Sequence, residues 1–151
     1  MLAIKPFVEE DRETYLCFGR DFYSGGAALH SIPEQYMEHT FDCLISGMPY
    51  ADGFMLWDGD QRAGYCLISF LWSTEAGGLL ALIDELYISP DFRGKKLGST
   101  FLEEIEAYYQ GKIVGLRLEV CDTNEGAIRL YQRHNFRFLD YRQMLKLFDK
   151  D

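Results

Sequence analysis

Apolar residues recur at helical spacing near the start of the chain. Tyr15, Phe18 and Phe22 lie three and four residues apart, which is the spacing of one buried helix face. Acidic residues at 9–11 precede them, where the helix dipole favours carboxylates. The pattern therefore predicts an amphipathic helix, and a short first strand precedes it at residues 3–6.

A second helix is predicted after a loop that contains glycine. Ser31 and Glu34 have the spacing of a capping box, in which each side chain accepts a hydrogen bond from the other residue's backbone N–H. Apolar residues then recur at helical spacing, and the predicted buried face consists of Met37, Phe41, Leu44 and Ile45.

The middle of the chain changes to the pattern of strands. Residues 54–57 are apolar and lead into Asp58 and Gly59, which together are a strong signal for a hairpin turn. Long apolar runs predict two further strands, at 62–72 and 79–88.

Helix and strand patterns alternate in the last third of the chain. A strand is predicted at 113–120, and a helix after it is capped by Asn124 or Thr123 and closed by Asn135, which tolerates the left-handed conformation. The helix between the two groups of strands carries Leu97, Phe101, Ile105 and Tyr108 on its apolar face.

Residues 136–139 and 143–148 predict two closing strands. The element order is then β-α-α-β-β-β-α-β-α-β-β, which indicates an α/β fold with a mixed sheet flanked by helices. The sequence has 151 residues, an ordinary size for one domain, so we expect a single domain over residues 1–151.

Composition narrows the classes of protein that remain. Apolar residues make up 48% of the chain, yet no stretch approaches the roughly 20 apolar residues of a membrane span. The first residues lack the layout of a secretion signal, so we expect a cytoplasmic protein without a membrane partner. The four cysteines are far apart, which favours neither a zinc site nor disulfides; we expect no metal, and core positions for Cys43, Cys66 and Cys121.

The formal net charge is −9, which argues against nucleic-acid binding because that function needs a basic face. The same charge suits a cationic substrate, although many proteins are acidic for solubility alone.

One segment, residues 83–99, combines a strand, a loop with Gly94 and basic residues, and a helix start. Free N–H groups at a helix N-terminus bind phosphate, and glycine lets the backbone approach it closely. Arg93, Lys95 and Lys96 add positive charge. The segment is therefore a candidate pyrophosphate site, although an ordinary turn with solvated lysines has a similar sequence.

The segment resembles motif A of the GNAT superfamily of N-acetyltransferases, with Arg93-x-x-Lys96-x-Gly98 in the place of [QR]-x-x-G-x-[GA]. A second match begins at Asn124 and includes Ala127, Leu130, Tyr131 and Phe136, and it is similar to the superfamily signature N-x-x-A-x-x-L-Y-x-x-x-G-F. The two motifs stand in the order found in this superfamily, and the element order agrees as well. The resemblance implies the fold of the superfamily, a mixed and mostly antiparallel sheet flanked by helices.

The chain departs from these motifs at two positions. Lys96 replaces a glycine, so it is strained if the position needs a positive φ, or else its ammonium group contacts a phosphate. Asn135 replaces the glycine before the final phenylalanine, which is a mild change.

The resemblance implies that acetyl-CoA binds as cosubstrate between the strand containing Asp84 and the next strand, because the first of these strands bulges and splays in the superfamily. The Leu86 N–H would face the thioester oxygen. The residues implied to bind the cosubstrate are Leu86, Tyr87, Ile88, Arg93, Gly94, Lys95, Lys96, Leu97, Gly98, Ser99, Asn124 and Tyr131.

The resemblance also implies catalytic residues for the transfer of acetyl to a primary amine. Tyr131 matches the general acid that protonates the departing sulfur, and its alternative role is a core aromatic. Glu119 is the first candidate for the general base, Glu85 is the second and Asp84 is the third, and each could instead be a solvated carboxylate.

The resemblance also implies that residues 22–36 and Tyr141 form the acceptor pocket. The apolar loop 23–30 within this range could close over a substrate. We favour a small-molecule amine as the acceptor; a protein lysine or N-terminal amine is the first alternative. A non-catalytic acyl-CoA-binding domain is the second. Dimers through the final strand are common in the superfamily, so a homodimer is one expected state.

Overall fold

The computed structural model describes residues 1–26 and 28–149, and its centre is one five-stranded sheet. The strands follow the order of the sequence: β1 (Leu2–Pro6), β2 (Ala51–Asp58), β3 (Gln61–Ser73), β4 (Gly78–Ile88) and β5 (Gly115–Leu118). Strands β1 to β4 pair antiparallel, whereas β5 runs parallel to β4. The predicted α/β class with a mixed, mostly antiparallel sheet is therefore confirmed.

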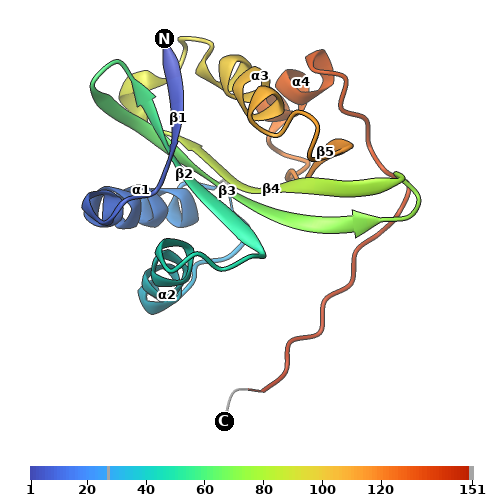
Figure 1. The fold of residues 1–151 in the computed structure, drawn as a ribbon, viewed down its shortest axis with the longest axis horizontal. Coiled ribbons are helices and arrows are strands. Elements are labelled where there is room, and N and C mark those ends of the chain that lie inside the picture. Colours follow the sequence, from blue (N-terminus) through green and yellow to red (C-terminus); the bar gives the residue numbers. More distant parts are fainter. Residues whose placement is uncertain (27, 150–151) are drawn as a thin grey trace.

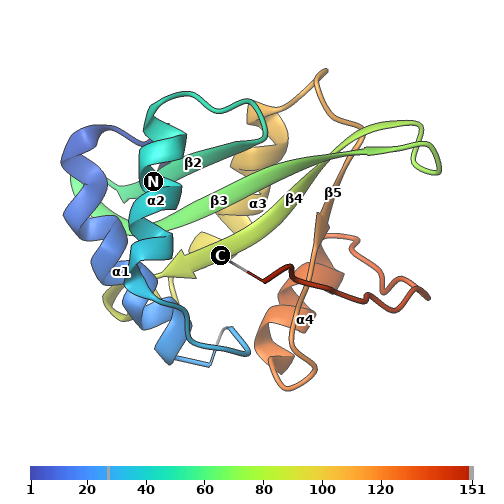
Figure 2. The same cartoon turned by 90° about the horizontal axis from the view of Figure 1, so that it is seen from below.

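Helices cover both faces of this sheet (Figures 1 and 2). Helices α1 (Arg12–Ser24) and α2 (Glu34–Ile45) lie on one face, and α3 (Leu97–Tyr108) and α4 (Glu125–Arg133) lie on the other. Two short 3₁₀ turns, η1 (Glu9–Asp11) and η2 (Pro90–Phe92), precede α1 and α3. None of the helices in the described part of the chain is long and apolar enough to cross a bilayer.

Strand β3 is buried on both faces, and its alternation divides the core in two. Tyr65 and Leu67 pack with α1 and α2, whereas Cys66 and Ile68 pack with α3. All four side chains are at most 6% exposed. The sheet is therefore held from both sides, which gives its middle strands fixed positions.

A bulge interrupts the pairing of β3 with β4. Leu67 pairs with Glu85 but Ile68 pairs with Ile83, so Asp84 is an extra residue. Because residues two apart in a regular strand share a face, this extra residue places Ile83 and Glu85 on opposite faces. Ile83 joins the core under α3, and Glu85 turns towards α1.

Strand β4 also separates from β5 at this point. The two strands pair only from Leu80 with Gly115 to Ile83 with Leu118. Beyond Ile83, β4 continues to Ile88 without a partner on that side in the described sheet. The bulge and the splay implied by the resemblance are both present.

The expected capping box of α2 is absent. Pro33 occupies the N-cap position and no side chain caps the helix. The Glu34 carboxylate instead accepts hydrogen bonds from Arg20 of α1, at 2.5 Å from Nη2 and 3.0 Å from Nε. A charge-assisted contact between helices has replaced the local hydrogen bond. The acidic residues 9–11 likewise form the separate turn η1 rather than the first turn of α1.

The two predicted closing strands are also absent: residues 136–139 and 143–148 are extended chain without strand pairing. The expected strand at 113–120 is shorter, because β5 comprises only Gly115–Leu118. Asn135 does adopt a positive φ of 67° after α4, as expected for a residue that closes a helix.

Candidate active site

The loop before α3 has the backbone conformation of an anion site. Gly94 has φ 78° and Lys96 has φ 60°, so the position of Lys96 does require the left-handed region. Lys96 is the N-cap of α3, and no side chain caps this helix. The first bond within the helix runs from the Thr100 N–H to the Lys96 carbonyl at 3.2 Å. The preceding amides are those that a helix N-terminus offers to an anion.

A cavity of about 570 Å³ opens at this N-terminus, and we term it the basic cavity. Three of its residues are cationic, Arg93, Lys96 and Arg133, and none is acidic. Its full lining is Ile88, Phe92, Arg93, Gly94, Lys96, Leu97, Gly98, Ser99, Gly126, Leu130 and Arg133. This combination of cations, glycines and helix N-terminus fits a pyrophosphate group.

Neighbouring contacts fix the cavity. Arg93 Nε donates to the Ile88 carbonyl at 2.9 Å, and the Ser99 hydroxyl lies 2.9 Å from His134 Nε2, which joins the start of α3 to the end of α4. A Cβ atom at Gly98 would lie 2.8 Å from Leu130 Cδ2. Gly98 thus allows α3 to pack closely on α4. Lys95 points elsewhere, with its ammonium 5.1 Å from the centre of the Phe92 ring.

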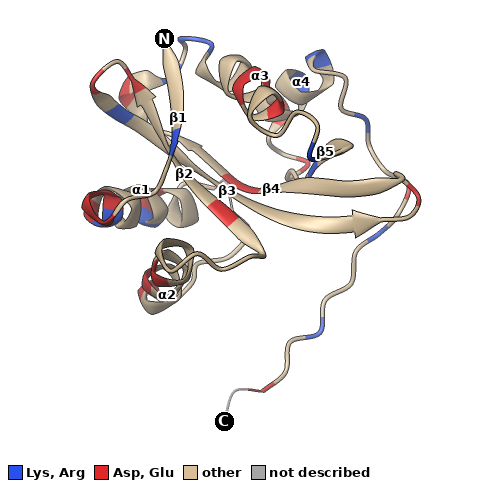
Figure 3. Cartoon of the chain, in the orientation of Figure 1, with Lys and Arg blue, Asp and Glu red and all other residues tan. Residues whose placement is uncertain are grey.

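A second cavity, of about 620 Å³, lies where β4 separates from β5, and we term it the acidic pocket. Three carboxylates line it: Asp84, Glu85 and Glu119. Figure 3 shows the acidic residues of β4 in the middle of the sheet. The rest of the lining is Phe22, Tyr23, Ala28, Leu29, Thr40, Leu44, Met48, Ala51, Leu67, Val120 and Cys121.

This lining tests the acceptor pocket that the resemblance implied. The end of α1 and the following loop contribute as expected through Phe22, Tyr23, Ala28 and Leu29. Ala27 of the same loop lies outside the described residues. Tyr141 is elsewhere, because its hydroxyl donates to the Glu75 carboxylate at 3.3 Å, near the β3–β4 turn.

Two tyrosines hold Glu85. The Tyr65 hydroxyl donates to Oε1 at 2.7 Å, and the Tyr23 hydroxyl donates to Oε2 at 3.0 Å. Burial raises the pKa of Glu85, the two phenols lower it, and the nearby Asp84 charge raises it. Sequence reasoning placed Tyr23 in the acceptor pocket without linking it to Glu85, and it missed Tyr65, whose only signal is its place in the predicted strand 62–72.

The other two carboxylates have different surroundings. The Ser69 hydroxyl donates to Asp84 across the bulge. Burial raises the pKa of Asp84, the Ser69 hydrogen bond lowers it, and the charge of Glu119 raises it. Glu119 is exposed and follows the end of β5, so it lines both the acidic pocket and the cavity beside it.

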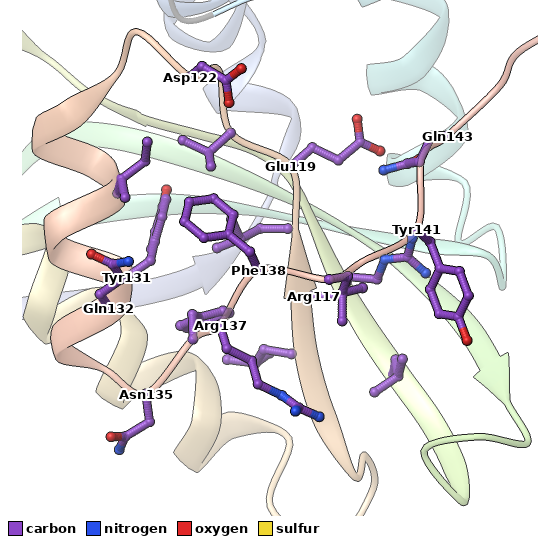
Figure 4. A pocket seen from close by; sticks show the side chains of 17 residues that line it. Arg117, Glu119, Asp122, Tyr131, Gln132, Asn135, Arg137, Phe138, Tyr141 and Gln143 are labelled. Atoms are coloured by element: carbon purple, nitrogen blue, oxygen red, sulfur yellow. The ribbon is translucent and has the colours of Figure 1, made fainter.

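That neighbouring cavity, of about 590 Å³, is termed the β5 groove (Figure 4). Its lining comes from Leu80, residues 116–120, Asp122, helix α4, residues 135–139, Tyr141 and Gln143. Tyr131 lies in this groove and packs against Phe136, with ring centres 5.6 Å apart. Burial, and to a smaller extent Cys66, raises the pKa of Tyr131. The structure thus places Tyr131 and Glu119 in one cavity.

Of the remaining residues predicted to bind the cosubstrate, some line a cavity and others have structural contacts. Leu86 and Ile88 lie on the separated part of β4, and Ile88 lines the basic cavity. Tyr87 is only 6% exposed and its hydroxyl donates to Asp21. The Asn124 side chain accepts from the Ala127 N–H at 3.3 Å, so it caps α4 as one of the two predicted residues.

The cysteines are all free thiols, but only Cys66 is buried. Cys43 and Cys121 are half-buried, so the expectation of core positions is wrong for both. Within residues 1–26 and 28–149, no three His, Cys, Asp or Glu side chains are grouped so that they could hold a metal ion.

Comparisons with known proteins place the chain in a family. The family model described as "Acetyltransferase (GNAT) family" matches residues 12–136. A Thialysine N-epsilon-acetyltransferase of Caenorhabditis elegans is 36% identical over 80 residues, which are 52% of this chain and 49% of that protein. The chain thus matches about half the length of this curated relative.

Solved structures share the whole fold at low identity. A possible acetyltransferase from Clostridium difficile 630 has a TM-score of 0.84 at 17% identity, with 99% of each chain covered. A predicted acetyltransferase with acetyl-CoA from Clostridium acetobutylicum has a TM-score of 0.74 at 14% identity, with 97% of this chain and 96% of that chain covered.

Proposed function

The chain belongs to the acetyltransferase (GNAT) family, and on that premise we propose that it transfers acetyl from acetyl-CoA to a primary amine of a small cationic molecule. The family and the enzyme class predicted from the sequence are confirmed. One observation carries the finer proposal: a basic cavity and an acidic pocket both border β4.

The basic cavity would hold the cosubstrate. The amides at the start of α3 and the side chains of Arg93, Lys96 and Arg133 suit its phosphates. Acetyl-CoA supplies an acetyl group activated as a thioester. The backbone of β4 beyond Ile83 lacks a partner on the β5 side in the described sheet, so the N–H groups of Leu86 and Ile88 would hold an extended arm.

The acidic pocket would hold the acceptor. Three carboxylates in one small pocket attract an ammonium group and exclude anions. The pocket has apolar walls from α1 and α2, which suit an aliphatic chain. The partial relative is named for thialysine, a small amine, which supports this choice over a protein acceptor.

Two of the carboxylates and Tyr131 would divide the chemistry. Glu119 removes a proton from the amine nitrogen, so that the nitrogen can bond to the carbonyl carbon while the carbon–sulfur bond breaks. The Tyr131 hydroxyl donates a proton to the departing sulfur, since a phenol is protonated at neutral pH. Glu85, whose two oxygens already accept phenolic hydrogen bonds, anchors a second positive charge of the substrate.

The first experiment is calorimetric titration with acetyl-CoA and with free CoA. We expect micromolar binding at one site. Thiol release is then measured with a panel that contains an aliphatic diamine, a monoamine of equal length and a peptide with a free N-terminus, and mass spectrometry identifies the product. The diamine should have the highest kcat/KM.

Other outcomes would overturn the proposal. A peptide with a higher kcat/KM than the diamine would favour a protein acetyltransferase. Binding of acetyl-CoA without transfer to any amine would favour a non-catalytic acyl-CoA-binding domain. The cytoplasmic location stays a prediction.

A further inference from the structure

Two hydrogen bonds of opposite direction join the end of α1 to the separated part of β4. The Tyr23 hydroxyl of α1 donates to Glu85 of β4 at 3.0 Å, and the Tyr87 hydroxyl of β4 donates to Asp21 of α1. Glu85 belongs to the acidic pocket, whereas neither Asp21 nor Tyr87 lines the acidic pocket or the basic cavity. The bond between Tyr87 and Asp21 therefore does not act by touching a substrate in either cavity.

Tyr87 is a buried side chain with a fixed position. Its ring stacks on that of Tyr65, with ring centres 5.9 Å apart and planes at 26°, and the centre of the Phe18 ring lies 5.1 Å away. A buried hydroxyl needs a hydrogen-bond partner, and the Asp21 carboxylate supplies it. The hydrogen bond and the two ring contacts together hold the Tyr87 ring in one orientation.

The guanidinium of Arg93 lies against this ring. Its central carbon is 5.8 Å from the centre of the Tyr87 ring, which is within the range of a cation–π contact. Arg93 Nε also donates to the carbonyl of Ile88, the residue after Tyr87, at 2.9 Å. Burial, and after it the bond to Asp21, raises the pKa of Tyr87, whereas Arg93 lowers it, so the cation interacts with the phenol. Arg93 is otherwise exposed, and it is one of the three cations of the basic cavity.

We propose that Asp21 and Tyr87 are positioning residues, which hold the Arg93 guanidinium ready for a phosphate of the cosubstrate. The inference rests on the proposed function, because it takes the basic cavity as the site of acetyl-CoA. A phenol that donates to a carboxylate becomes richer in electrons, so its ring attracts a cation more strongly. A long and exposed side chain loses rotamer freedom when it binds a ligand, and prior orientation by Tyr87 lowers that cost. The end of α1, which borders the acidic pocket, is thereby connected to the cosubstrate site.

Tyr87→Phe removes the hydroxyl and keeps the ring. Calorimetric titration with free CoA should show a Kd about 3- to 10-fold higher than that of the wild type. KM for acetyl-CoA should rise with it, while kcat is unchanged. The matched control is Tyr109→Phe, because Tyr109 is another buried phenol that donates to a carboxylate, Asp52, and it does not line the basic cavity. This control should lose stability in urea but keep the wild-type Kd, and an equal rise of Kd in both variants would overturn the proposal.

Asp21 offers a second test that leaves the core intact, since this residue is exposed on α1. Asp21→Ala should weaken CoA binding as much as Tyr87→Phe does. Asp21→Asn should restore most of the affinity, because its amide oxygen accepts the same hydrogen bond. Wild-type affinity in Asp21→Ala would contradict the positioning role.

A double-mutant cycle decides whether the effect passes through Arg93. Tyr87→Phe should have no further effect on the Kd of CoA when it is added to Arg93→Ala, and effects that simply add would reject the inference. If the folded wild-type protein did not bind CoA at all, the proposed function would fail and the inference with it. Equal binding by the wild type and by Tyr87→Phe would reject the inference alone.

Discussion

The basic cavity and the acidic pocket border the same strand but are assembled in different ways. The residues of the basic cavity come mainly from one continuous segment, 88–99, and the rest come from α4. The acidic pocket combines residues from α1, α2, β4 and the chain after β5, which are far apart in the sequence. The difference shows that an acidic protein can build a cationic site from one short segment, in which a helix N-terminus adds to the charge of the side chains.

Because the two sites are built separately, a substitution in one should leave the function of the other intact. Glu119→Gln in the acidic pocket should have the largest effect. Without a base in the pocket, kcat should fall by about 10²- to 10⁴-fold, while the Kd of acetyl-CoA is unchanged. Steady-state kinetics and calorimetry measure the two quantities. Glu103→Gln, an exposed change on α3, is the control. Full kcat in Glu119→Gln, with loss of activity in Asp84→Asn, would transfer the role of base to Asp84.

Tyr131→Phe should have the next largest effect. Loss of the acid should lower kcat by about 10- to 1000-fold with little change in the affinity for acetyl-CoA, because the ring still packs against Phe136. Single-turnover measurements separate chemistry from product release. An unchanged rate of chemistry would leave Tyr131 with a packing role only.

Glu85→Gln tests whether the acidic pocket binds a second positive charge of the acceptor. If Glu85 anchors a second charge, KM for the diamine should rise by about 10- to 100-fold, since buried charged contacts are worth several kcal/mol when one partner is removed. KM for the monoamine should change little, so the monoamine is the internal control. Equal increases for both substrates would contradict an anchoring role.

Lys96→Gly tests the cavity side with a smaller effect. Glycine adopts the φ of 60° without strain, so the free energy of unfolding in urea should rise by about 1 kcal/mol. The Kd of acetyl-CoA should nevertheless increase several-fold, because a cation of the basic cavity is lost. Lys95→Gly is the matched control, and it should not stabilise the protein. Unchanged affinity in Lys96→Gly would mean that its ammonium makes no phosphate contact.

Asp84→Asn should have the smallest effect, and the effect depends on pH. Burial raises the folded-state pKa of Asp84 above its ordinary value of 3.8, so the folded state binds more protons than the unfolded state as the pH rises above that value. Stability is therefore lost with rising pH across that window. Asn removes this cost, so urea unfolding should show a small gain in stability at pH 7 and none near pH 3. Glu106→Gln is the exposed control.

The sequence was a good guide wherever the relevant contacts are local. The loop from Arg93 to Ser99 could be predicted because its glycine, its cations and its helix start are contiguous. The partners of Glu85 could not, because Tyr23 and Tyr65 are 62 and 20 residues away from it and meet it only after the sheet forms. The capping box failed for a similar reason, since Arg20 competes for Glu34.

The closing strands failed for a different physical reason. Residues 143–148 do have a strand pattern, but a strand also needs a neighbour that supplies hydrogen bonds. The pattern reports a preference of one segment and says nothing about where its partner is. The segment therefore has a local tendency to form a strand, but it forms none in this structure.

The extra residue in β4 also has a consequence for how the strand tolerates change. Before the bulge, Ala81 and Ile83 face the core under α3; after it, Glu85 and Tyr87 face α1, although all four positions are odd. Core and active site therefore occupy one strand in two phases of alternation. A substitution in β4 alters one face of the strand only. The insertion or deletion of a single residue next to position 84 would instead reverse the faces of all residues on one side of it, so that Glu85 would turn into the core under α3.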